Sequence, residues 1–429
     1  MKPLLSAVAV VLVVVGCGPN PPVPVRVMAV APTETGLYST REVQLQTITS
    51  ITAMKGSVAQ FIGGGRIVLD STDPLQNLAG GLANQTANQR YQAVVKDQGL
   101  DVRGNFIERG GVLWPADFDT WNMVSTYYNF EQSYTYYADL AGIELPEIQN
   151  QRVFYAPEVH FNDPNALTDN ALYLSFIDSF VLVPQRNDQL VPLSMNLGVI
   201  GHEVAHKIFN HRVMADQGIH PALLTWNLVP FNLLKSIDEG FADFHGYGAT
   251  VESIGGPQPD FLRHSISNAA AVTARDLSRN QACMTASLRN ALKNFSPTQW
   301  VSSPELYEVG TIFAASFYQV GNRIGGVPTI ITLENALLKS YNDPSATTPG
   351  LSQLLNQNVN NPAAFTPEAV ANIIASHIGN QVNDPLRVAW CTEITNRMQL
   401  SCIQFPCDEM PACGGAAKRD GDCKVVVPQ

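Results

Sequence analysis

Two histidines and a glutamate with metal-binding spacing lie near the middle of the chain, in Gly201-His202-Glu203-Val204-Ala205-His206. Residues 194–214 contain no proline and place apolar side chains at helical spacing, which predicts a buried helix. On this helix His202 and His206 are one turn and about 40° apart, so both imidazoles can reach one ion. Glu203 lies beside them, where its carboxylate can act as a general base on a water at the open position of a zinc site.

A third metal ligand must come from another element, because a catalytic zinc ion takes three protein ligands and one exchangeable water. Glu239 is the best candidate, since the intervening residues leave room for a proline-containing connection and a second helix that begins near Lys235. Asp243 follows four residues later, on the same face of that helix. A carboxylate in this position is suited to accept the remaining ring N–H of a metal-bound histidine.

The pattern His202-Glu203-x-x-His206 followed by Glu239-x-x-x-Asp243 resembles the gluzincin metallopeptidases, with thermolysin and the fungalysins nearest by pattern. The resemblance implies that His202, His206 and Glu239 bind Zn²⁺. It also implies that Glu203 activates water and that Asp243 orients the first histidine. The implied fold is α+β of the zincin type, with a mixed-sheet lobe, a mostly helical lobe and the zinc in the cleft between them. Nothing resembles a site for a free amino terminus, so we expect an endopeptidase that acts on peptide or protein substrates.

Two further features of that family have partial matches in the chain. Asn170-Ala171 stand where the family has an edge strand that binds the peptide substrate by backbone hydrogen bonds, although an ordinary sheet strand has the same pattern. The family's histidine that donates a hydrogen bond to the oxyanion is replaced by Tyr307, whose hydroxyl can also donate. His264 is a second candidate for this role and His220 a third, and each of the three is also compatible with a structural role.

The replaced histidine leaves a second hypothesis open. The chain could instead be a surface lipoprotein that keeps the zinc fold for binding or scaffolding without hydrolysis, although the intact Glu203 favours the enzyme. The remaining histidines do not affect this choice. Neither His211 nor His245 faces the expected ion on its helix, and His160 and His377 have no motif around them.

The first residues predict export and lipid anchoring. Leu4 to Val15 form an apolar run that is shorter than the about 20 residues needed to span a bilayer, so residues 1–16 are expected to be a signal peptide. Gly16-Cys17 resembles a bacterial lipoprotein cleavage site with Cys17 as the lipid-modified residue; the alternative is cleavage elsewhere. A proline-rich stretch follows, and residues 17–40 are expected to form a spacer. Lipid at Cys17 would hold the protein outside the cytoplasm, on the outer membrane or cell surface.

Composition and charge argue against nucleic acid as a partner, and the sequence also suggests where the domains begin and end. The net charge is −11, from 26 basic and 37 acidic residues without a basic cluster, which argues against nucleic acid as a partner. We expect an N-terminal α/β lobe over 41–193, the active-site helix and a helical lobe over 194–390, and a disulfide-rich tail over 391–429.

Cysteine usage supports an oxidising compartment. Besides Cys17 the chain has Cys283, Cys391, Cys402, Cys407, Cys413 and Cys423. Because the glycine- and proline-rich tail cannot bury much apolar surface, we expect disulfides there, with Cys283 tethering the tail to the helical body. The pairing cannot be deduced from spacing. A metal cluster is the rival interpretation, disfavoured because the spacings lack Cys-x-x-Cys pairs.

Hydrophobic patterns predict the elements that must position these residues. Short apolar or alternating runs flanked by turn residues predict strands at 42–52, 66–70, 111–114, 153–155, 170–174 and 180–183. Aromatic and apolar residues at helical spacing predict a core helix at 117–140 and further helices at 262–274, 281–293, 307–320 and 329–338.

Overall fold

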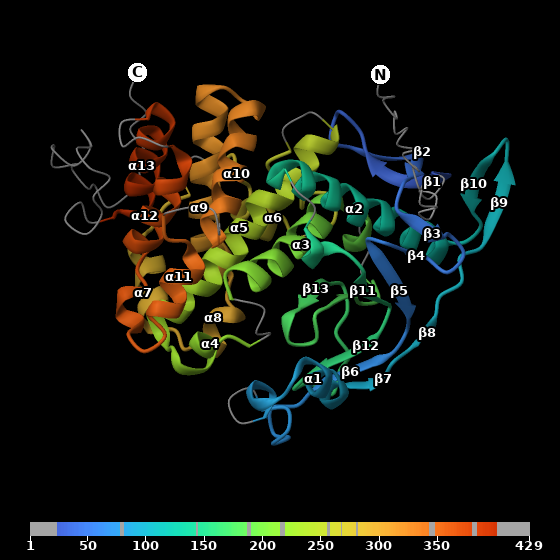
Figure 1. Ribbon diagram of the computed structural model, residues 1–429, viewed down its shortest axis with the longest axis horizontal. Helices are drawn as coiled ribbons and strands as arrows, with labels where there is room; N and C mark the ends of the chain where they lie inside the picture. The colour runs from blue at the N-terminus through green and yellow to red at the C-terminus, as the bar shows by residue number, and fades with distance from the viewer. Residues whose placement is uncertain are drawn as a thin grey trace, which may run out of the picture.

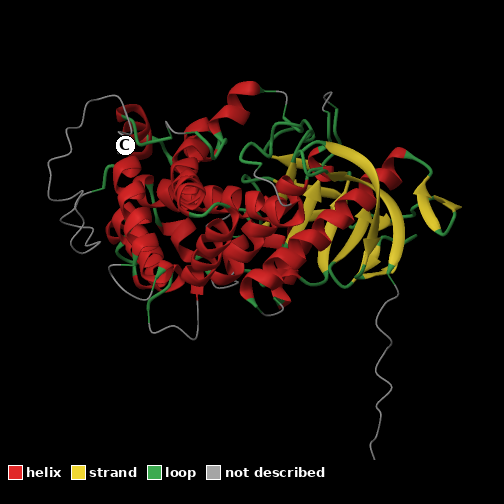
Figure 2. Cartoon of the chain, turned by 90° about the horizontal axis from the view of Figure 1, so that it is seen from above, coloured by secondary structure: helices red, strands yellow, loops and turns green. Residues whose placement is uncertain are grey.

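Strands and helices gather at opposite ends of the molecule (Figure 1, Figure 2). The computed structural model describes residues 24–400, apart from 78–80, 143–144, 187–189, 215–218, 255–257, 267, 280–281, 343–347 and 380–383. The expected signal peptide, Cys17 and the four cysteines after Leu400 lie outside the described residues. Strands come from the first half of the chain and most helices from the second, so the predicted α+β class is confirmed. Within the described ranges, no helix has both the length and the apolar character needed to cross a membrane.

The described strands form three sheets. The largest contains, in spatial order, β13 (Ala171–Leu174), β14 (Ser179–Leu182), β11 (Gln151–Tyr155), β5 (Ala59–Gly63), β4 (Lys55–Gly56) and β3 (Ile48–Ser50), with β8 (Leu100–Asp101) also paired to β5. The second contains β2 (Tyr38–Leu45), β1 (Val25–Pro32), β10 (Val112–Pro115) and β9 (Phe106–Arg109). The third contains β12 (Glu158–Phe161), β6 (Arg66–Leu69) and β7 (Val95–Asp97).

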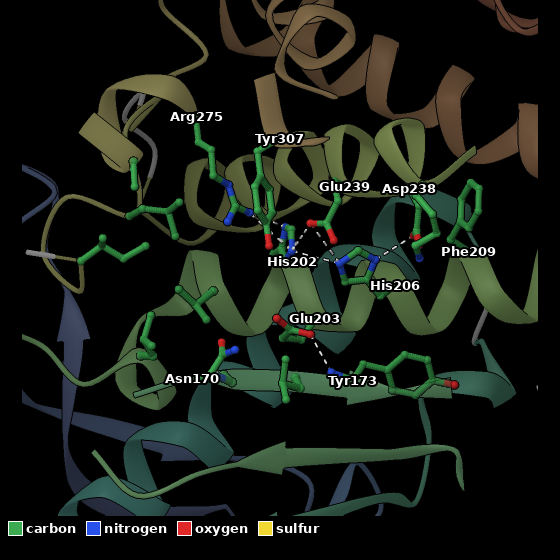
Figure 3. Close-up of a pocket in the computed structure, with 18 of the residues that line it drawn as sticks. Asn170, Tyr173, His202, Glu203, His206, Phe209, Asp238, Glu239, Arg275 and Tyr307 are labelled. Atoms are coloured by element: carbon green, nitrogen blue, oxygen red, sulfur yellow. Dashed lines mark hydrogen bonds and ion pairs between the residues drawn. The ribbon is translucent and has the colours of Figure 1, made fainter. Parts of the chain in front are cut away.

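The strand that was expected to bind substrate is confirmed as an edge strand. β13 ends the largest sheet and pairs antiparallel with β14, so that Ala171 lies opposite Leu182 and Tyr173 opposite Phe180. The apolar runs at 153–155 and 180–183 fall in β11 and β14, which pair in parallel. The other edge of β13 faces the metal-binding helix (Figure 3).

The spacer prediction is wrong for residues 25–40. β1 and the start of β2 lie there, paired antiparallel from Val25 opposite Leu45 to Pro32 opposite Tyr38. β1 buries Val27 and Ala29 completely, but the residues on its other face are also mostly apolar. Without a polar face the segment lacks the alternation that marks a half-buried strand, and the nearby prolines mask it further.

The helices of the described chain include those that carry the predicted motifs. Their bounds are α1 (Ala87–Val94), α2 (Phe118–Ala141), α3 (Leu197–Arg212), α4 (Pro221–Thr225), α5 (Leu228–Ile254), α6 (Ala269–Ala274), α7 (Ala286–Asn294), α8 (Pro297–Val301), α9 (Pro304–Ile324), α10 (Val327–Asn342), α11 (Leu351–Gln357), α12 (Pro367–Ile378) and α13 (Pro385–Met398). The helices predicted at 117–140, 194–214, 307–320 and 329–338 are therefore confirmed.

Three predicted boundaries need correction. α5 begins at Leu228 and not near Lys235, because Pro230 falls in its first turn, where a missing N–H breaks no intrahelical hydrogen bond. The helix predicted at 262–274 exists only as α6, since turns occupy the preceding residues. The tail predicted from 391 begins inside α13. Cys391 lies in that helix, and both Cys283 and Cys391 are disulfide-bonded, as predicted.

Glycines allow α3 and α5 to approach closely. A Cβ on Gly246 of α5 would lie 2.6 Å from the carbonyl oxygen of Gly198 and 3.2 Å from Cβ of His202, both on α3. A Cβ on Gly240 would overlap Gly310 of α9 in the same way. The backbone of α5 is therefore held against both neighbouring helices. This packing brings residues 239 and 243 to the histidines.

Gly246→Ala should destabilise the protein. Alanine gains roughly 1 kcal/mol in helix propensity, but separating α5 from α3 costs about 1–3 kcal/mol in overpacking, and zinc affinity should fall as the ligands move apart. Thermal unfolding and zinc titration measure both effects. Gly201→Ala is the comparison, because its Cβ would lie 3.0 Å from the Ala249 methyl group and 3.3 Å from Cα of Gly246, which are looser contacts than the 2.6 Å approach at Gly246. An equal or larger effect at Gly201 would contradict this interpretation.

Candidate metal centre

Three electron-pair donors converge between α3 and α5 (Figure 3). Nε2 of His202 lies 3.0 Å from Nε2 of His206. Oε2 of Glu239 lies 3.4 Å from the first of these nitrogens and 3.6 Å from the second. Tetrahedral zinc with bonds of about 2.0–2.2 Å separates neighbouring donors by roughly 3.3–3.6 Å. The two distances to Glu239 fall in this range and the distance between the imidazole nitrogens is slightly shorter, so a small movement of the rings would let the three side chains hold a zinc ion.

Hydrogen bonds orient both imidazoles for this arrangement. His202 donates from Nδ1 to Oδ1 of Asp243 at 2.9 Å, which is the role predicted for this aspartate. His206 donates from Nδ1 to Oδ1 of Asp238 at 2.7 Å. With these protons on Nδ1, the neutral rings turn their Nε2 lone pairs toward each other and toward Glu239. Protons or a cation must occupy the space between three such acceptors.

Each of the two aspartates is itself paired with a cation. Arg275 binds Asp243 through two of its guanidinium nitrogens, Nη2 to Oδ1 and Nε to Oδ2, the latter at 3.0 Å. Lys235 Nζ lies 2.8 Å from Oδ2 of Asp238. The predicted site thus lacked three residues: Asp238, Lys235 and Arg275. Asp238 and Lys235 had a signal in the sequence, because Asp238 is an acidic residue directly before Glu239 and Lys235 precedes Glu239 by one helical turn. Arg275 had none.

The pKa values show that the space between His202, His206 and Glu239 favours positive charge. Burial, the largest influence, lowers the pKa of His206, but the charges of Asp238 and Glu239 outweigh it and raise that pKa well above its usual value. Burial is also the largest influence on His202, and hydrogen bonds to Asp243 and Glu239 more than offset it, so its pKa rises. The histidines in turn hold the pKa of Glu239 well below its usual value against the effect of burial.

Glu203 projects from α3 toward β13, on the side of the helix nearest the sheet (Figure 3). Its Oε2 accepts a hydrogen bond from the backbone N–H of Tyr173 at 2.7 Å. Burial raises the pKa of this carboxyl group. The strand therefore fixes the carboxylate beside the metal-binding histidines, in an environment that favours proton uptake, as a general base requires.

The strand residues predicted to bind substrate lie at the same place. Asn170 and Ala171 both line the cavity that contains the metal-binding residues. Alternate residues of an antiparallel strand direct their N–H and C=O groups to the same edge, so Ala171 shares the edge of Tyr173, which faces α3. The side-chain Oδ1 of Asn170 accepts a hydrogen bond from the N–H of Ala171 at 2.9 Å. The side-chain amide nitrogen of Asn170 can then donate to another group.

Of the candidates for oxyanion stabilisation, the structure places only Tyr307 in the cavity. Its ring stacks under the guanidinium of Arg275 at 4.5 Å, and Glu239 and burial raise its pKa, so the hydroxyl keeps its proton. The prediction for His264 is wrong in position: this ring packs edge-on against Tyr38, and it does not line the cavity. Nδ1 of His220 accepts from the Ala222 N–H at the start of α4 and its Nε2 donates to Oδ1 of Asn356, so His220 is structural.

The remaining histidines lie away from the metal centre, as predicted. His211 contacts Asp178, and His245 is buried with Nδ1 at 2.8 Å from the Tyr136 hydroxyl. His160 binds Glu158 in β12. They therefore offer no fourth ligand.

The cavity itself has a volume of about 570 Å³, in the range of ligand-binding clefts. β13 and α3 form one wall, and α5, α6 and the start of α9 form the other. Phe209 lies beside Asp238 in this cavity (Figure 3). Aliphatic side chains also line it, among them Leu193, Val199, Leu262, Ile266, Ala271 and Ala274.

Comparison of the sequence with known proteins identifies no relative. The chain matches no protein-family model, and no curated protein matches it. The assignment of chemistry therefore depends on the residues and their geometry.

Zinc should stabilise the protein more strongly as pH rises from about 6.5. The raised pKa of His206 contributes stability to the metal-free protein below the unfolded-state pKa, and this is lost as pH rises through the folded-state pKa. Zinc needs the unprotonated ring, so its binding displaces protons and strengthens over the same window. The difference in melting temperature with and without zinc measures this.

Asp238→Asn is the control for this pH dependence. It keeps a hydrogen-bond acceptor for Nδ1 of His206 but removes a charge that raises the histidine pKa, so the slope against pH should flatten. Stabilisation by zinc that does not change with pH in either protein would contradict the assignment.

Proposed function

We propose that the chain is a zinc-dependent metallopeptidase of gluzincin type that cleaves internal peptide bonds. The observation that carries this is the convergence of His202, His206 and Glu239, with both rings oriented by carboxylates and with Glu203 beside them, hydrogen-bonded to the edge strand β13. A zinc ion held there supplies Lewis-acid activation of water and of the scissile carbonyl. The protein groups do the rest of the chemistry.

Substrate binding and proton transfer follow from the positions of β13 and α3. An extended peptide would pair with the outer edge of β13 at Ala171, taking the place of the Asn170 side chain on the Ala171 N–H, and this would place a backbone amide over Glu203. Glu203 would take the proton of the attacking water and deliver it to the leaving amine, and its raised pKa suits a group that must both accept and donate. Because the Tyr173 N–H holds this carboxylate, little reorientation is needed before reaction.

Tyr307 would stabilise the transition state. Its protonated hydroxyl enters the cavity from the wall opposite Glu203 and can donate to the developing oxyanion. The guanidinium of Arg275 fixes the ring from one face. A tyrosine in this place can therefore supply the donor that the resembling family takes from histidine, which favours the enzyme over a zinc-binding scaffold without activity.

The cavity between the strand-bearing and helical parts supports a two-lobe zincin architecture, and we include this in the proposal. We also propose, from the sequence alone, that Cys17 carries lipid and holds the enzyme outside the cytoplasm. Mass spectrometry of the mature N-terminal peptide tests this. Acyl chains on Cys17 are expected, whereas an unmodified N-terminus at another residue would contradict it.

Glu203→Gln should abolish peptide cleavage while one equivalent of zinc stays bound, because the ligands are unchanged and only the general base is lost.

Tyr307→Phe should lower kcat about 10²–10³-fold with little change in KM. Cleavage of quenched fluorescent peptides and metal analysis on the same samples measure both.

Tyr173→Phe is the matched control, since it removes a hydroxyl that binds Asp178 and keeps the N–H that binds Glu203. It should retain activity. Zinc binding without cleavage of any peptide in a broad library would favour the non-hydrolytic lipoprotein. Full activity in Glu203→Gln would overturn the mechanism.

A further inference from the structure

A second hollow adjoins the cavity that holds the candidate metal ligands, at the start of β13. Its volume is about 500 Å³, close to that of the first. Asp169, Asn170 and Leu193 line both. The second hollow then continues between the start of α2 and the residues that follow β14, away from the metal-binding residues. The two hollows are thus parts of one groove that is longer than the reaction requires.

The junction between the two hollows is held open by a fixed backbone. Asp169 adopts a left-handed conformation with φ of 56°. Its N–H donates to the carbonyl of Pro184 at 3.0 Å, and its Oδ1 accepts from the N–H of Arg186 at 2.7 Å. These bonds tie the segment after β14 to the residue before β13. Because non-glycine residues adopt positive φ at some cost, the surrounding contacts must hold this geometry in place.

The walls of the second hollow combine exposed apolar groups with polar ones. Leu190 is 86% exposed and Phe118 is 63% exposed, and both line it. Asn122, Tyr155 and Arg186 supply polar groups on the same walls. Large apolar side chains that remain in water beside a cleft commonly mark a binding surface. A polypeptide matches this mixture, because it presents apolar side chains together with backbone donors and acceptors.

We propose that the second hollow binds the continuation of the polypeptide whose bond is cleaved at the metal centre, so that the substrates are long chains or protein segments and not short peptides. The direction in which β13 runs supports a polypeptide as the occupant of the second hollow. A chain that pairs with the outer edge of β13 passes Ala171 and reaches Asn170 and Asp169, where the second hollow begins. Contacts there add binding far from the scissile bond. This inference rests on the proposed peptidase function.

The test uses a nested set of peptides with one central sequence, extended stepwise at either end with apolar residues. In the full protein with zinc, kcat/KM should rise with length on one side only, the side that enters the second hollow. Leu190→Ser and Phe118→Ser should each lower kcat/KM for the longest peptides by about tenfold, through lost apolar contact, and leave the shortest unchanged. Leu100→Ser, 80% exposed on β8 and outside both hollows, is the matched control.

A second readout separates failure of this inference from failure of the proposed function. Binding of the same labelled peptides to Glu203→Gln, followed by fluorescence anisotropy, needs no turnover and should show the same length dependence, lost on adding Leu190→Ser. Absence of cleavage by the natural protein, together with this binding pattern, would refute the peptidase and support the long groove. Cleavage or binding that does not depend on length, or equal losses for short and long peptides, would overturn the groove.

Discussion

The close approach of α3 and α5 is the constraint on which the metal centre depends. The histidines lie on one helix and the glutamate on the other, so the separation of the two backbones sets the distance between the donors. A side chain at Gly246 would meet the carbonyl oxygen of Gly198 and force the two helices apart. The second contact, between Gly240 and Gly310, holds α9 on the other side of α5 and thereby places Tyr307 over the same site. The packing of these helix backbones therefore sets the positions of the groups at the metal centre.

Charge balance is the second requirement of such a buried site. Glu203, Asp238, Glu239 and Asp243 are four acidic groups placed around two imidazoles, and burying them without compensation would be costly. Lys235 and Arg275 each pair with one aspartate, and Nη2 of Arg275 also lies 3.3 Å from Nδ1 of His202. The remaining charge of Glu239 points at the space between the imidazoles. The electrostatics thus concentrate an unmet negative charge at one point, which is where a divalent ion fits.

Much of this centre could be predicted from the sequence because its parts are local. The spacing of His202 and His206 fixes their relation on any helix, and the same holds for Glu239 and Asp243. Arg275 could not be predicted, since it reaches Asp243 from a turn whose position depends on tertiary packing. His264 was assigned wrongly for the same reason: its position near α6 in sequence gives no information on which way the turn faces. β1 was missed because both of its faces are apolar, so that only pairing with β2 reveals it as a strand.

The anchoring of the two imidazole rings also bears on which ions the protein can distinguish. Two nitrogens and one carboxylate oxygen, each held by its own hydrogen bond or helix, offer too few oxygen ligands for calcium or magnesium, which prefer six or more. Abundant hard cations are therefore rejected by ligand type and number, whatever their concentration. Among borderline metals such as zinc, cobalt and nickel the same donors discriminate weakly, and the tighter-binding copper would compete. The identity of an ion bound at this site would accordingly depend on the metal supply of the compartment in which the chain folds.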